Sequence, residues 1–131
     1  MGDQEGVIAP DVELRLPADG GYVAVLRTAT AGLAARLDFA LDEVEDLRIA
    51  VDEACALLLA QARADSSLAA SFWLDATSLS IDVATECVSP VAPSRDSFAW
   101  NVLSALVNSV ASSVDEDRLV ISLTRQTRSP R

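Results

Sequence analysis

Histidine is absent from this chain of 131 residues. Without it, neither the Ser-His-Asp arrangement of hydrolases nor the Cys-His arrangement of cysteine proteases can be built, and the usual zinc sites are excluded. The two cysteines, Cys55 and Cys87, provide no disulfide framework and no zinc-binding spacing, so we expect both to be reduced and packed. Any catalysis would therefore depend on carboxylates, hydroxyls or thiols.

Positive charge is scarce as well. Ten Lys and Arg residues stand against twenty Asp and Glu residues, which gives a formal net charge of -10. This is the wrong sign for binding phosphates or an anionic membrane surface, so we expect no nucleic-acid partner and no membrane partner. The surplus of acid suits a basic protein partner, although many acidic proteins have none.

Long apolar runs are missing too. No run approaches the ~18 residues that span a bilayer, and the opening MGDQEGVIAPD lacks the basic flank and apolar centre of a secretion signal. We therefore expect a cytoplasmic protein. Residues 1–10 and 127–131 are polar and carry glycine or proline, so we predict flexible tails on either side of a single domain at 11–126.

The apolar residues of that domain recur with the periods of both β-strands and α-helices. Period-two patterns predict four strands, and spacings of three or four residues predict three helices. The strands are predicted at 12–18, 67–75, 78–86 and 118–125, and the helices at 22–37, 42–63 and about 99–110. The resulting order, β-α-α-β-β-α-β, is typical of an α/β (α+β) two-layer sandwich in which helices cover one face of a mixed, largely antiparallel sheet.

The helix at 42–63 carries a glutamate whose direction can be predicted. Its apolar stripe defines the buried side, and consists of Val44, Leu47, Val51, Ala54 and Leu58. At roughly 100° per residue, Glu53 points well away from this stripe, on the side of Asp46, Ala50 and Leu57. Glu53 could therefore face a cleft. From position alone, one more solvated acid on an acidic helix is the favoured interpretation.

The segment DLRIAVDEA in this helix resembles the N-box helix of the GHKL superfamily, in particular of the anti-sigma factor kinases related to RsbW and SpoIIAB. LRLPADGGYVAVLR is similar to the family's opening strand, turn and first helix. SFAWNVLSALVNSV is similar to its final helix, and DRLVISLTR to its closing strand. The similarity extends over nearly the whole chain, from Val12 to Arg125, through motifs that are individually loose. It implies a GHKL, or Bergerat-like, fold.

The resemblance also implies where nucleotide chemistry would lie. In active members a glutamate of the N-box helix is the general base, and an asparagine one turn later binds magnesium. The resemblance places these positions at Glu53 and Leu57, and leucine offers magnesium no oxygen. ATP-binding members also use a glycine-rich lid, whereas here no glycine follows Gly32 and the corresponding TECVSPVAPSRDSFAW contains prolines. We therefore expect no cofactor, no metal and a vestigial Glu53.

Protein partners are the remaining expectation from the resemblance. Members of the family hold a sigma factor away from RNA polymerase and release it to an anti-anti-sigma antagonist, and they commonly form homodimers. Arg27 falls where the family carries an arginine that contacts both partners, and Tyr22 lies near it; an ordinary solvent-facing arginine is an equal interpretation. Two alternatives stay open: an ATP-dependent serine kinase that uses Mg-ATP on its antagonist, and a kinase-derived interaction module for another regulator.

Overall fold

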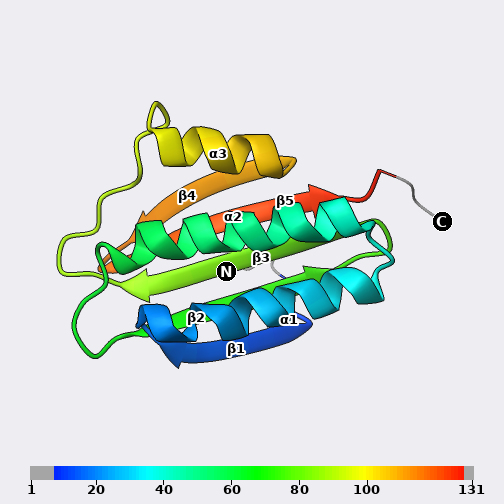
Figure 1. Cartoon of the computed structure of the whole chain (residues 1–131). Helices are drawn as coiled ribbons and strands as arrows, with labels where there is room; N and C mark the ends of the chain where they lie inside the picture. Colours follow the sequence, from blue (N-terminus) through cyan, green and yellow to red (C-terminus); the bar gives the residue numbers. More distant parts are fainter. Residues whose placement is uncertain (1–7, 129–131) are drawn as a thin grey trace.

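The computed structural model describes residues 8–128, which form two layers (Figure 1). One layer is a five-stranded sheet in which all neighbouring strands are antiparallel, and three α-helices cover one of its faces. The predicted fold class is confirmed. The strands are β1 (Val12–Pro17), β2 (Ser67–Leu74), β3 (Ser78–Glu86), β4 (Ser109–Asp115) and β5 (Arg118–Gln126). The helices are α1 (Val23–Arg36), α2 (Leu41–Leu59) and α3 (Phe98–Leu106), with a 3-10 turn, η2 (Gly20–Tyr22), before α1.

The core lies between the sheet and the helices. Alternate side chains of the inner strands are buried against the helices, as the period of two requires. Cross-strand register places Phe72 of β2 opposite Ile81 of β3, and Ile81 opposite Leu123 of β5, so that these apolar side chains form one continuous row. The strand order is β1-β2-β3-β5-β4, which puts the last strand of the chain inside the sheet.

The third helix is shorter than its apolar spacing predicts. Ser97 caps its first turn by accepting a hydrogen bond from the N–H of Trp100, and the helix ends at Leu106 because Val107 adopts an extended backbone. The predicted continuation to Val110 is wrong. Residues 109–115 instead form β4, a strand missing from the predicted order. Its sequence SVASSVD has a weak period of two, and pairing with β5 decides its conformation.

The ends of the described chain make defined contacts. The Trp73 indole N–H donates to the carbonyl of Ile8, and Arg128 binds the start of α2. Of the predicted tails, residues 1–7 and 129–131 lie outside the described residues. Within residues 8–128, no helix is long and apolar enough to cross a membrane.

Candidate functional site

The side of α2 that carries Glu53 faces α3 and β5. Asp46, about two turns earlier on the same side, accepts a hydrogen bond of 3.0 Å from Arg125 of β5, and Arg125 also donates to the carbonyl of Leu106 at the end of α3. Ala50, between them, is completely buried. Glu53 itself is half-buried, and within residues 8–128 no hydrogen bond or ion pair involves its carboxylate. Its predicted direction, away from the main apolar stripe, agrees with this geometry.

Leu57 occupies the next turn of the same side. Its side chain is half-buried and packs against the hydrophobic core. A leucine in this environment offers no ligand to a hard cation and adds apolar surface where the resemblance implies a metal-binding amide. Among residues 8–128, no three acidic or cysteine side chains gather into a group that could hold a metal ion. The residues present therefore do not fit the magnesium site of an active kinase.

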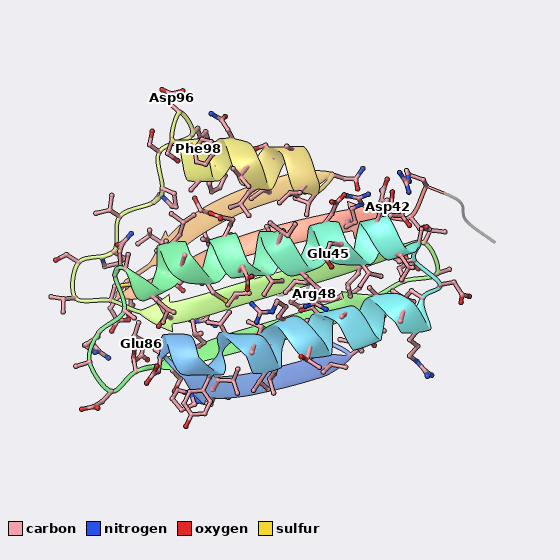
Figure 2. The ribbon with its side chains drawn as sticks, viewed as in Figure 1. Asp42, Glu45, Arg48, Glu86, Asp96 and Phe98 are labelled. Atoms are coloured by element: carbon pink, nitrogen blue, oxygen red, sulfur yellow. The ribbon has the colours of Figure 1, made fainter. Side chains whose placement is uncertain are left out.

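The loop after β3 is attached to the C-terminal end of this helix. Gln61, one turn beyond Leu57, donates from its side-chain amide to the carbonyl of Val91 over 2.8 Å and accepts from the Val91 N–H over 2.9 Å. This pair fixes the backbone at the centre of the segment that the resemblance aligns with a nucleotide lid. The segment is also apolar on its outer side, where Val88, Val91 and Phe98 are 79%, 64% and 83% exposed. Phe98 is labelled at the start of α3 in Figure 2.

Arg27 and Tyr22 lie on the other side of α2, around α1. The Arg27 guanidinium donates to Asp52 over 2.7 Å and is partly buried between α1 and α2. Tyr22 is 44% exposed at the start of α1, next to Val25, which is 47% exposed. A shallow apolar depression of about 470 Å³ follows along α1. Arg27 thus faces α2, Tyr22 lies exposed at the start of α1, and Glu53 lies on the side of α2 toward α3 and β5.

The sequence analysis missed the most heavily bonded carboxylate of the chain. Glu43, in the first turn of α2, is 1% exposed. It accepts hydrogen bonds from the N–H groups of Ala40 and Arg128 and from the Thr127 hydroxyl, and the guanidinium groups of Arg128 and Arg125 lie 3.2 and 3.9 Å away. The only sequence signal was an acid three residues after the helix entry. Its partners other than Ala40 are more than eighty residues away in the chain and could not be found locally.

The ionisation of these groups follows from their contacts. Burial alone would raise the pKa of Glu43, but the donated hydrogen bonds from Ala40, Arg128 and Thr127, together with the Arg128 charge, hold the pKa below its usual value. A hydrogen bond from Arg128 likewise lowers the pKa of Asp42, which Figure 2 shows at the start of α2. Burial raises the pKa of the Cys55 thiol to about 12. Cys55 and Cys87 are both free and buried, as predicted.

Known proteins were compared with the chain as a whole. No family model matches it. Curated relatives named serine-protein kinase RsbW, from Bacillus thuringiensis, Bacillus cereus and Bacillus anthracis, are 39% identical over 80 residues, which is 60% of this chain and 50% of each relative. A crystal structure of the RsbU and RsbW domains of a Mycobacterium tuberculosis protein matches with a TM-score of 0.66 at 18% identity, over 94% of this chain and 35% of that one. The chain is RsbW-like in sequence and in fold.

The RsbW-like chain spans about half the length of the curated relatives it matches. The resemblance to RsbW is thereby confirmed, and the Mycobacterium tuberculosis structure extends the likeness of fold to almost the whole chain. The relatives carry the name of a kinase. At the two positions where the resemblance places the general base and the magnesium ligand of a kinase, this chain has Glu53 and Leu57.

Proposed function

We propose that this RsbW-like chain sequesters an RNA polymerase sigma factor and is released by an anti-anti-sigma antagonist, without a nucleotide. The observation that carries the proposal is Leu57. It stands one turn after Glu53 on the helix that resembles the N-box, and its side chain packs on the core. If the fold of the relatives is kept and an apolar side chain stands in place of the metal ligand, partner binding is the activity that remains.

The chemistry of phosphoryl transfer supports this choice. Catalysis of that reaction consists almost entirely of positioning and of stabilising charge, chiefly through magnesium and backbone N–H groups around the phosphates. Glu53 supplies neither. The loop that would cover the phosphates has Pro90 and Pro93, which lack N–H donors. The N–H of Val91 in the same loop already donates to the side chain of Gln61. A general base alone leaves most of the activation barrier in place.

The surface of α1 supports partner binding. From Tyr22 to Ala35 the only charged residue is Arg27, whose guanidinium is held by Asp52 on the side of α1 that faces α2. Tyr22, which is 44% exposed, and Arg27 are of the residue types that are enriched in interface hot spots. Because the chain carries a net charge of -10, a basic sigma-factor segment would also be attracted over a longer range.

Two measurements test the proposal. Calorimetric titration with Mg-ATP should show no binding, with serine-protein kinase RsbW of Bacillus cereus as the positive control. Micromolar binding, followed by phosphate transfer to a co-purifying antagonist, would favour the kinase that the relatives' name indicates.

The second measurement concerns the partner itself. The tagged chain should capture a sigma factor from its host, and Arg27→Glu should weaken that capture by roughly tenfold or more, as expected for loss of a hot spot. Asp52→Ala is the matched control, since it breaks the same ion pair and leaves the arginine in place. Equal capture by wild type and Arg27→Glu would show that Arg27 does not contribute to the interface. Capture of a different class of regulator would contradict the sigma-factor assignment.

A further inference from the structure

The two outer strands of the sheet are protected to different degrees. β1 has Pro17 on its edge, with the exposed charges of Glu13 and Arg15, which are common devices against pairing with another chain. The other outer strand, β4, reads SVASSVD and has neither a proline nor a charge before its last residue. Its backbone pairs with β5 alone, and Val114 is 44% exposed. β4 is therefore an edge that can accept a further strand.

A groove runs between this edge and α3. It has a volume of about 290 Å³ and is lined by Trp100 and Ser104 of α3, by Ser109 and Val110 of β4, and by Arg95 just before α3. The Arg95 guanidinium lies over the Trp100 ring, 5.7 Å from its centroid. Within residues 8–128, Arg95 makes no ion pair. This acidic chain thus places a guanidinium without an ion-pair partner among the described residues, that of Arg95, in a groove beside the unpaired edge of β4.

We propose that the groove binds an extended peptide of a partner protein, which pairs with β4 as a sixth strand and places a carboxylate at its C-terminal end on Arg95. An edge strand flanked by a helix is suited to this mode, because the backbone supplies hydrogen bonds and the groove receives alternate side chains. This site is separate from the Glu53 side of α2 and from the α1 surface, and it goes beyond the proposed function.

The direction of the peptide follows from the position of Arg95. Arg95 shares the groove with Ser109 and Val110, at the beginning of β4. A strand that runs antiparallel to β4 ends at that point, so its C-terminal carboxylate, or an acidic last residue, meets the guanidinium. On the helix side of the sheet, Val110 and Val114 lie across from the buried Leu123 and Leu119. The peptide should therefore present apolar side chains at every second position.

Titration of the isotope-labelled full chain with a defined probe tests this proposal by NMR. The probe is an acetylated Thr-Val-Thr-Val-Glu peptide with a free C-terminus, and the comparison probe is the same peptide ending in a lysine amide. We expect amide shifts confined to β4 and the start of α3, and at least tenfold weaker binding of the lysine probe. Arg95→Glu and, independently, Val114→Lys should each weaken binding of the acidic probe roughly tenfold, with circular dichroism unchanged.

Arg15→Glu is the matched control, because it reverses an exposed arginine at the opposite edge of the sheet. It should leave the affinity for the acidic probe unchanged. The proposal is overturned if the acidic probe shifts no β4 amide, if Arg95→Glu binds as wild type does, or if Arg15→Glu loses binding equally. It is also overturned if the β4 amides shift with protein concentration in the absence of peptide, since the edge would then bind a second copy of the chain.

Discussion

Glu43 and Glu53 are glutamates of the same helix, about three turns apart, and they differ in almost every physical respect. Glu43 is 1% exposed and is bonded by three donors and flanked by two arginines, whereas Glu53 is half-buried and has no bonded partner among residues 8–128. The resemblance singled out Glu53, whereas the hydrogen-bond network of the structure singles out Glu43 as the glutamate whose removal should cost more stability.

Removal of the Glu43 charge should have the largest effect. Glu43→Gln removes the buried charge that the Arg128 N–H and guanidinium contact, while Arg128 keeps Asp42 and Arg125 keeps Asp46, so the free energy of unfolding should fall by about 2 kcal/mol. Urea denaturation followed by circular dichroism measures it. Glu45→Gln is the control, because Glu45 points outward on the same helix and has only a long contact to Arg48 (Figure 2). A loss below about 1 kcal/mol would show that the network is not a main support of the fold.

The pH dependence of the stability that Glu43 contributes should sharpen its comparison with Glu53. Because the folded-state pKa of Glu43 is lowered from its usual 4.5, the ionised carboxylate stabilises the fold fully above that value. The contribution is lost as the pH falls from 4.5 through the lower folded-state pKa. The difference in unfolding free energy between wild type and Glu43→Gln should therefore be constant above about pH 5 and shrink in acid. A difference that grows in acid would mean that the pKa is raised instead.

Glu53→Gln should have the smallest effect on stability. With no bond to break, the change in unfolding free energy should stay within about 0.5 kcal/mol. The same urea denaturation measures it, and sigma-factor capture by this variant should equal that of wild type under the proposed function. A loss above 1 kcal/mol would reveal a structural role for Glu53 and would contradict the contrast between the two glutamates.

Most of the architecture could be predicted because its patterns are local. The strands predicted at 67–75 and 78–86 alternate in part, and the structure agrees with them to within a residue. β4 could not be predicted in the same way, since its serines and alanines carry little signal and its partner β5 follows in the chain. Glu53 and Leu57 were correctly placed on one side of α2 by helical spacing. Glu43 was missed because its partners, Thr127 and Arg128, are distant in sequence.

The position of β5 bears on how the protein is made. β5 is the last strand of the described residues, yet it lies between β3 and β4, and the residues after it complete the bonding of Glu43 across 85 positions. In a nascent chain that ends before Arg118, β1, β2 and β3 can pair, β4 has no partner, and Glu43 lacks the donors of Thr127 and Arg128. Such non-local pairing is slow. The sheet and the start of α2 should therefore reach their final arrangement only after residues 118–128 have been synthesised.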